Sequence, residues 1–380
     1  MKKVVVLGST GSIGRQTLDV VRSAPDKFKV IALSASNNAN LLAEQAREFS
    51  PSLVCLKNES VPMPDCEAEI LRGENSASIA AQLEEADIIV NGISGFDGML
   101  PLISALKAGK KVALANKESV VCGHVLTDEA LKTEGAEILP VDSEQSALFQ
   151  CLFSGAKKEV ARLILTASGG PFREYSKEQL QCVTVEDALA HPTWNMGRKI
   201  TIDSASLFNK GLEIMEASYL FGIEGDRINV LVHPQSIVHS MVEFCDGSNI
   251  AQLSKPDMRL AIQYAMTYPE RKQGEFGKLR LEEITNLSFH APDNEKFPAL
   301  LLAYEALKEG KALPIAYNAA NEVAVDAFIK GELKFTQIAS VVEKTMERTK
   351  TGEINCVDDI LDIDAQARHT AVDIMKGMVI

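Results

Sequence analysis

The sequence is short of the features that mark nucleic-acid-binding and disulfide-bonded proteins. Its 380 residues carry a formal net charge of −13, and the lysines and arginines are scattered, which argues against the basic stripe that nucleic acid requires. The cysteines at positions 55, 66, 122, 151, 182, 245 and 356 form no C-x-x-C pair. This spacing excludes a plausible disulfide framework and predicts buried thiols in a reducing cytoplasm.

Long apolar runs are also missing. No stretch reaches the ~18 apolar residues of a transmembrane helix, and the run at residues 4–7 is too short for the core of a signal peptide. With 46% hydrophobic residues, the chain is long enough for about two or three globular domains. We therefore expect several cores and no membrane partner.

A glycine-rich turn follows the first apolar run. Residues 3–7 have the composition of a buried strand, and a helical pattern follows the turn. Gly8, Gly11 and Gly14 suit a tight turn that brings backbone amides close to a pyrophosphate at the helix N-terminus, although Thr10 stands where a second glycine often falls. The strand before the turn and the helix after it favour a dinucleotide site.

Strand and helix patterns then alternate up to residue 142, with further strands near 28–33, 53–56, 87–91 and 111–115. This alternation predicts a parallel, doubly wound sheet with ligands at the carboxyl ends of its strands. No Asp or Glu follows the second strand to bind a ribose 2′-hydroxyl, which favours NADP over NAD. The residues there, Ser36, Asn37 and Asn38, are neutral where Arg or Lys usually meets the 2′-phosphate.

Two carboxylates one residue apart end the apolar run that begins at residue 137. In a strand, alternate side chains point the same way, so Asp142 and Glu144 would converge on one hard divalent cation. The alternative is an acidic first turn that caps a helix at 143–150. Two interpretations are also possible for the polar residues that follow the strand at 111–115, which are Asn116, Lys117 and Glu118. They form either a ligand-binding group at a strand end or a solvated loop with a helix cap.

The middle of the chain carries groups suited to anions. A strand at 162–166 leads into Ser168 and two glycines, and then into a long irregular segment with the only tryptophan. Loops of this kind are more often lids than spacers, so we expect a lid at 168–198, with a surface loop around one packed Trp as the alternative. A helix from after residue 203 to about 220 places Asn209 and Glu213 one turn apart beside Lys210, unless this Lys–Glu pair is only a solvated face.

Strand patterns at 227–232, 237–244 and 250–253 predict an antiparallel sheet with a hairpin turn near 246–249. His233 is either a ligand or a packed core histidine, and the core role is favoured. Amphipathic helices are expected near 298–309, 313–330, 336–348 and 357–377.

These patterns predict an α/β protein with an N-terminal Rossmann-like dinucleotide-binding domain, a central α+β catalytic domain with an antiparallel hairpin, and a C-terminal four-helix domain. The expected boundaries are 1–142 for the dinucleotide domain, 143–268 for the catalytic, metal-binding and dimerisation domain, 269–297 for a linker, and 298–380 for the helical domain.

Several motifs together resemble the 1-deoxy-D-xylulose 5-phosphate reductoisomerase family, and the resemblance spans essentially the whole chain. They are the segments 8–14 (GSTGSIG), 116–118 (NKE), 141–144 (VDSE), 167–170 (ASGG), 191–197 (HPTWNMG), 209–213 (NKGLE) and 233–236 (HPQS). The resemblance implies conversion of 1-deoxy-D-xylulose 5-phosphate, a phosphorylated ketose, to 2-C-methyl-D-erythritol 4-phosphate in the non-mevalonate isoprenoid pathway. The reaction would use NADPH and one divalent metal, Mg²⁺ or Mn²⁺.

The resemblance also implies roles for individual residues. The metal ligands would be Asp142, Glu144 and Glu213, and Lys117 and His191 would join them in catalysis. The substrate contacts would be Lys117, Ser143, Glu144, Ser168, His191, Trp194, Ser204, Asn209, Lys210 and Glu213. The cofactor contacts would be Thr10, Gly11, Ser12, Ile13, Ser36, Asn37, Asn38, Asn116, Glu118, Met196 and Gly197. The chain departs from the family near Ser36 and Asn37, where the family commonly carries glycine and a basic residue.

Two other functions remain open at this point. One is a different metal-assisted NADP-dependent dehydrogenase, and the other is a non-catalytic nucleotide sensor that has kept the Rossmann-like half. A homodimer is expected, because the hairpin at 237–253 has the pattern of an exposed sheet edge that a twofold partner would cover, as in the family.

Overall fold

In this computed structural model, residues 1–190, 194, 197–350 and 352–378 are described. They form two compact units, each built from two stretches of the chain. The first unit combines residues 1–146 with 257–277, and the second combines 147–256 with 278–380. The N-terminal unit is therefore completed by a segment from much later in the sequence.

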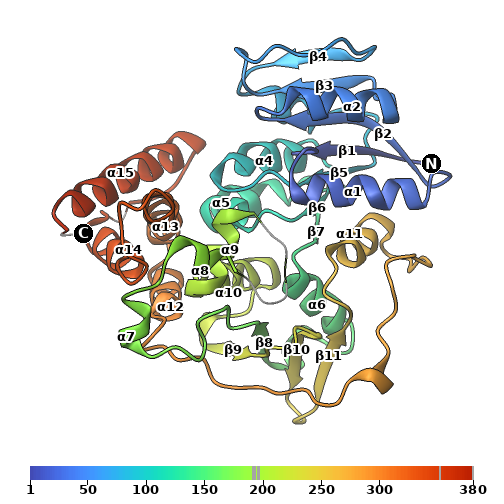
Figure 1. Ribbon diagram of the computed structural model, residues 1–380. Coiled ribbons are helices and arrows are strands. Elements are labelled where there is room, and N and C mark those ends of the chain that lie inside the picture. Colours follow the sequence, from blue (N-terminus) through green and yellow to red (C-terminus); the bar gives the residue numbers. More distant parts are fainter. Residues whose placement is uncertain (191–193, 195–196, 351, 379–380) are drawn as a thin grey trace. The chain divides into compact units, whose positions relative to one another are not determined.

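A seven-stranded parallel sheet forms the centre of the N-terminal unit (Figure 1). Its strands are β1 (Lys2–Leu7), β2 (Phe28–Ala35), β3 (Leu53–Leu56), β4 (Glu69–Arg72), β5 (Ile88–Asn91), β6 (Lys111–Leu114) and β7 (Glu137–Pro140). They lie in the order β4-β3-β2-β1-β5-β6-β7. Because the order reverses between β1 and β5, a ligand site is expected at the carboxyl ends of these two strands.

The helices of this unit follow the predicted alternation. They are α1 (Ser12–Ser23), α2 (Ala39–Phe49), α3 (Ser76–Ala80), α4 (Met99–Lys107) and α5 (Lys117–Ala130), and α6 (Ser143–Leu152) begins at its end. β3 and β5 are buried along their whole length, which explains their continuous apolar composition. The sequence analysis did not predict β4, because it is a largely exposed edge strand without an apolar pattern.

One helix reaches the N-terminal unit from far along the chain. The sequence analysis assigns residues 258–267 to the catalytic domain, but α11 (Met258–Thr267) packs against α1, β6 and β7. Its buried side chains include Ile262 and Met266, and Lys2 Nζ donates a hydrogen bond to the Met266 carbonyl at 3.1 Å. Packing partners this distant in sequence leave no trace in a local pattern.

The second unit is built around a four-stranded mixed sheet in the order β11-β10-β8-β9. β10 (Val238–Phe244) and β11 (Asn249–Leu253) form the predicted antiparallel hairpin. The prediction was wrong for β9 (Ile228–Val232), which pairs in parallel with β8 (Val160–Ala167). β8 lies between β9 and β10, so these two neighbours in sequence cannot pair directly.

The helix predicted from after residue 203 to about 220 is two helices. α9 (Arg198–Ser206) begins before the predicted start, and α10 (Phe208–Phe221) follows a break at Leu207, whose φ is 63°. Such a left-handed residue ends one helix and redirects the next. Two short helices, α7 (Lys177–Leu180) and α8 (Val185–Leu189), also lie within the segment that was expected to be irregular.

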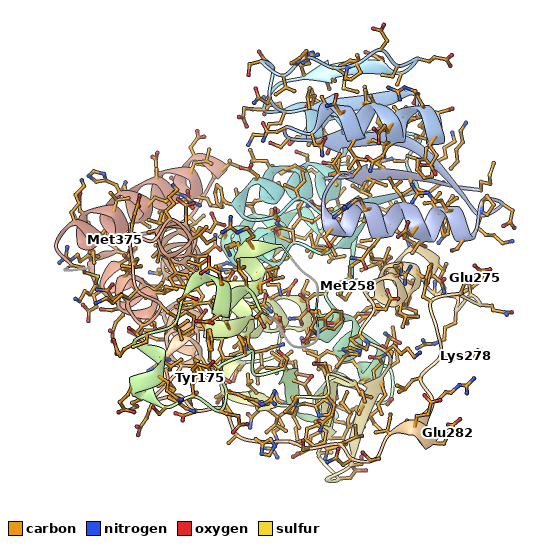
Figure 2. The ribbon with its side chains drawn as sticks, viewed as in Figure 1. Tyr175, Met258, Glu275, Lys278, Glu282 and Met375 are labelled. Atoms are coloured by element: carbon orange, nitrogen blue, oxygen red, sulfur yellow. The ribbon has the colours of Figure 1, made fainter. Side chains whose placement is uncertain are left out.

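The four predicted C-terminal helices are confirmed as α12 (Ala299–Glu309), α13 (Leu313–Ile329), α14 (Gln337–Arg348) and α15 (Val357–Lys376). Before them, the stretch that carries Glu275, Lys278 and Glu282 is irregular except for η4 (Leu281–Glu283), and these three side chains are exposed (Figure 2). Among the described helices, none combines the length and the apolar character that crossing a membrane would need.

Candidate active site

The glycine turn connects β1 to α1 at the point where the sheet order reverses. Gly8 has a φ of 74°, and its amide donates to Ser34 Oγ at 3.0 Å. A Cβ on Gly14 would lie 2.3 Å from the Gly8 carbonyl oxygen, so only glycine lets α1 begin this close to the strand. The turn therefore presents the N-terminus of a twelve-residue helix, which is a site for an anionic group.

A buried side chain that the sequence analysis missed holds this turn. Ser9 Oγ donates to Gln45 Oε1 at 2.7 Å, and Gln45 Nε2 donates to the Ser9 carbonyl at 2.9 Å. Gln45 is 3% exposed and lies on α2. The only sign of its role in the sequence is that a polar residue falls among the apolar residues of one helix face. The predicted cofactor contacts on the turn are half-buried or exposed, as a binding surface requires: Thr10, Gly11, Ser12 and Ile13.

The predicted contacts at the end of β2 are exposed and neutral. Asn38 Oδ1 accepts from the Leu41 amide at 3.2 Å and caps α2. Asn37 Oδ1 accepts from Asn58 Nδ2 at 2.9 Å, and Asn37 Nδ2 donates to Ser36 Oγ at 3.3 Å. This segment is held by its own hydrogen bonds and brings no positive charge of its own.

At the end of β6, the helix cap that was one interpretation of residues 116–118 is found at Asn116. Asn116 caps α5, because its Oδ1 accepts from the Ser119 amide at 2.6 Å, and its Nδ2 donates to the Gly95 carbonyl at 2.7 Å. Lys117 is only 4% exposed, and its Nζ lies 2.6 Å from Asp142 Oδ2. Glu118 is half-buried in the first turn of α5. A solvated loop is therefore wrong for Lys117, whose charge is buried against a carboxylate.

Asp142 and Glu144 come together by a different route from the one that the sequence suggested. β7 ends at Pro140, so the two residues lie in the turn into α6 and in its first turn rather than on one strand. The Glu144 amide donates to Asp142 Oδ1 at 3.3 Å, and Ser143 Oγ donates to Glu144 Oε2 at 2.5 Å. The two side chains offer carboxylate oxygens within 4.8 Å of each other. The helix-capping interpretation and the convergence of carboxylates both hold.

A second cluster of charged side chains is buried on α10 in the other unit. Lys210 and Glu213 form an ion pair and are 4% and 1% exposed. Asn209 Nδ2 donates to Glu213 Oε1 at 2.6 Å. A solvated face is therefore excluded for this pair. Glu216, which the sequence analysis missed, is a further buried carboxylate one turn along the same helix, and its i, i+3 spacing from Glu213 was the available signal.

Ser168 and Ser204 lie on two segments of this unit that are packed closely together. Gly169 and Gly170 have φ values of 80° and 64°, and the Gly170 amide donates to Ser168 Oγ at 3.2 Å. A Cβ on Gly170 would lie 2.8 Å from Ala205 Cα and 3.1 Å from the Ser204 carbonyl oxygen. The two glycines therefore let the loop after β8 approach the α9 backbone closely.

Another buried carboxylate that was missed, Asp203, supports α9 from within the same unit. It is 2% exposed, and its Oδ1 accepts from Asn321 Nδ2 on α13 at 2.8 Å. Its Oδ2 pairs with Lys199 Nζ at 2.7 Å. The charge of Asp203 is thus compensated next to Ser204, which a local sequence pattern could not reveal.

The predicted lid is described only in part. The Trp194 ring lies 6.2 Å from the His239 ring, measured between centroids, with the planes tilted by 55°. Gly197 begins α9 by accepting from the Thr201 amide at 3.1 Å. His191 and Met196, to which the sequence analysis assigns substrate and cofactor contacts, lie outside the described residues.

His233 is the packed histidine that was favoured. It is fully buried and stacks on Phe289 with 4.7 Å between ring centroids. Its Nδ1 lies 2.9 Å from the Ser288 carbonyl oxygen, and its Nε2 accepts from the Val238 amide at 3.2 Å. Both ring nitrogens are therefore engaged in holding the backbone.

The glycine turn at the reversal point of a parallel sheet, together with the buried Lys and acidic side chains at a neighbouring strand end, defines a dinucleotide-dependent oxidoreductase of the α/β class. Family models match three stretches of the chain. Residues 4–124 match 1-deoxy-D-xylulose 5-phosphate reductoisomerase, residues 138–221 match the C-terminal domain model of that enzyme, and residues 253–370 match a further DXP reductoisomerase C-terminal domain model. The chain belongs to the 1-deoxy-D-xylulose 5-phosphate reductoisomerase family.

Individual relatives agree over the full length. The 1-deoxy-D-xylulose 5-phosphate reductoisomerase of Pelotomaculum thermopropionicum is 50% identical, with 100% of both chains covered. That of Chloroherpeton thalassium is 47% identical, covering 100% of this chain and 99% of its own. A solved structure of the Zymomonas mobilis enzyme in complex with NADPH has a TM-score of 0.93 at 40% identity and covers 99% of this chain and 100% of its own. A second solved structure, of a DOX-P reductoisomerase in complex with NADPH, fosmidomycin and magnesium, has a TM-score of 0.91 at 36% identity. It covers 99% of this chain and 98% of its own.

Proposed function

We propose that this protein converts 1-deoxy-D-xylulose 5-phosphate to 2-C-methyl-D-erythritol 4-phosphate, with NADPH as reductant and one divalent metal, Mg²⁺ or Mn²⁺. The observation that carries the proposal is the full-length match at 50% identity, in a chain that keeps the acidic residues and the glycine turn on which such chemistry depends. Relatives whose solved structures hold NADPH and magnesium support the same cofactors.

A single assay tests the proposal. NADPH absorbance should fall steadily only when the purified protein, the divalent metal and 1-deoxy-D-xylulose 5-phosphate are all present. Reduction of NADP⁺ by a hydroxy acid or by another sugar phosphate, with no turnover of 1-deoxy-D-xylulose 5-phosphate, would favour a different dehydrogenase. Binding of NADPH without any turnover would favour a nucleotide sensor.

The residues of the chain fit both NADPH and a divalent metal. The space that Gly14 leaves open beside the Gly8 carbonyl brings the N-terminus of α1 to the strand end, where a pyrophosphate needs backbone amides. Carboxylate oxygens are the ligands that Mg²⁺ and Mn²⁺ prefer. Asp142 and Glu144 would supply two of them, and we infer that Glu213 supplies a third.

The substrate's phosphate would be held by one buried cation and neutral donors. Lys210 would supply the charge, and Ser168, Ser204 and Asn209 would supply hydrogen bonds. One ammonium inside a pocket binds a dianion strongly, because water does not screen it there. This arrangement explains how a chain with a net charge of −13 can take an anionic substrate.

The rearrangement moves a carbon–carbon bond without net oxidation, and the resulting aldehyde then takes a hydride from NADPH on carbon and a proton on oxygen. When bound, the metal would polarise the carbonyl and stabilise the negative charge that develops on its oxygen. Lys117, whose ammonium lies 2.6 Å from Asp142, and Ser143 would orient the hydroxyl groups of the substrate. His191, Trp194 and Met196 would close over the site and exclude water.

Lys210→Ala should mainly raise KM for the phosphorylated substrate, by about 100-fold, because a charged hydrogen bond to phosphate is retained throughout the reaction. The change in kcat should be smaller. Steady-state kinetics across substrate concentration measures both, and Lys308→Ala, which removes an exposed lysine of the same unit, is the matched control. A loss confined to kcat would contradict the phosphate role.

Trp194 should report closure of the lid, because it is the only tryptophan. Its emission should change when NADPH, Mg²⁺ and fosmidomycin, a ligand of a relative, are added together, as the indole becomes buried. Trp194→Ala should lose turnover far more than it loses thermal stability. An indole signal that is indifferent to all three ligands would mean that the segment is structural.

We also propose a homodimer in the cytoplasm. β11 is the outermost strand of its sheet, and Ile250 on it is 37% exposed, so a twofold partner would cover an open edge. Light scattering at micromolar concentration should give twice the chain mass, and a monomer mass would refute the dimer. The prediction of buried thiols is confirmed for Cys55, Cys122 and Cys151 and is wrong for Cys182, Cys245 and Cys356, which are exposed. Burial, together with the charge of Glu69, raises the pKa of Cys55 to about 12, and free thiols of this kind support a reducing compartment.

A further inference from the structure

A lysine that the site does not yet use lies beside the neutral segment at the end of β2. Lys57 directly follows β3, and its amide donates to the Ala35 carbonyl at 3.0 Å. The Asn58 amide donates to the Ser36 carbonyl, also at 3.0 Å. The pairing of β2 with β3 thus continues past both strand ends. Lys57 is therefore anchored next to the segment that is expected to meet the ribose.

The Lys57 side chain extends toward the loop after β5. Its Nζ lies 2.6 Å from Asp97 Oδ2 in η1 (Phe96–Gly98) and 3.1 Å from Glu74 Oε2. In the sheet, β3 and β5 are separated by β2 and β1, which carry the neutral segment and the glycine turn. The Lys57–Asp97 pair therefore joins loops on either side of the two strands at whose ends a dinucleotide's adenosine half would bind.

The ammonium of Lys57 is charged and can exchange partners. Partial burial lowers its pKa, but the hydrogen bonds that the ammonium donates to the Asp97 and Glu74 carboxylates outweigh this, and the pKa lies above its usual value. The side chains of Asp97 and Glu74 are 57% and 79% exposed. Such ion pairs contribute little free energy, so a phosphate dianion with several acceptor oxygens can displace a carboxylate from the lysine.

We infer that Lys57 is the positive group that recognises the 2′-phosphate of NADPH in this chain, and that Asp97 and Glu74 compete with the phosphate for it. The family's basic residue after β2 is replaced here by Ser36, Asn37 and Asn38, and the cation is supplied by the neighbouring strand. Because two carboxylates face one lysine, discrimination against NADH is smaller than one free base would give. The inference rests on the proposed use of NADPH.

Binding rather than turnover tests it. Calorimetric Kd values for NADPH and NADH would be compared for the wild type, Lys57→Met, Lys57→Arg and Asp97→Asn. Lys57→Met should raise the Kd for NADPH by about 10-fold or more and leave the Kd for NADH unchanged, since one charged hydrogen bond to phosphate is lost. Lys57→Arg should keep the preference for NADPH over NADH. Asp97→Asn should lower the Kd for NADPH relative to that for NADH. Lys27→Met, at the opposite ends of the strands, is the matched control and should change neither Kd.

Each result decides something. Equal losses for both cofactors, or an unchanged NADPH Kd in Lys57→Met that melts like the wild type, would overturn the assignment of Lys57 and leave the proposed function intact. If Lys57→Met does not fold, the ratio of the two Kd values in Lys57→Arg and Asp97→Asn decides, and an unchanged ratio in Asp97→Asn overturns the competition. A wild-type protein that binds neither cofactor would refute the proposed function as well.

Discussion

Glu213→Gln should abolish metal-dependent turnover while NADPH binding persists. The substitution keeps the shape of the side chain and removes its charge, so a site of three carboxylates would lose a third of its negative charge. We expect kcat/KM to fall by roughly 1,000-fold, the size of effect seen when a group that stabilises developing charge is removed. Turnover measured against Mg²⁺ concentration and calorimetry with NADPH check the two halves of this expectation.

The surroundings of Glu213 set the controls for that experiment. Glu213 is buried and paired with Lys210, so the variant removes the charge that Glu213 brings to a buried ion pair and should lose about 3 kcal/mol of stability. Thermal melting must therefore confirm that the variant is folded at the assay temperature. Glu305→Gln makes the same chemical change at an exposed position of the same unit and should be silent. Normal turnover of Glu213→Gln at saturating Mg²⁺ would exclude Glu213 as a ligand.

Gly14→Ala should abolish NADPH binding. Its Cβ would lie 2.3 Å from the Gly8 carbonyl oxygen and 2.4 Å from Ser9 Cα, and both are backbone atoms that a side-chain rotation cannot move. Ser9 cannot shift freely either, because Gln45 holds it by two hydrogen bonds. The start of α1 must then move away from β1, which displaces the amides that would meet the pyrophosphate.

Two measurements separate the effects of this variant. Calorimetry should show NADPH affinity lowered by more than 100-fold, and the free energy of unfolding should fall by about 3 kcal/mol, the upper range for forced overpacking. Gly352→Ala adds the same methyl group where nothing lies within 4 Å and should change neither quantity. Unchanged NADPH affinity in Gly14→Ala would mean that the turn is not the pyrophosphate site.

Local chemistry made much of this protein predictable from its sequence. The spacing of Gly8, Gly11 and Gly14 between an apolar run and a helical pattern is enough to predict a strand, a turn and a helix with an exposed amide end. The four C-terminal helices follow from apolar side chains at helical spacing. These features depend on neighbours within a few residues, so the sequence carries them directly.

The tertiary structure decided whatever depends on distant partners. β9 pairs in parallel with β8, because β8 lies between β9 and β10 in the sheet. Asp142 and Glu144 converge through the turn into α6 rather than along a strand. The sequence by itself determined the family, the kinds of side chain at the site and the order of most elements. Only the tertiary structure showed that Lys117, Lys210 and Glu213 are buried and that Lys57 lies beside the neutral end of β2. Burial and strand pairing are properties of whole packed surfaces, and no short stretch of sequence contains them.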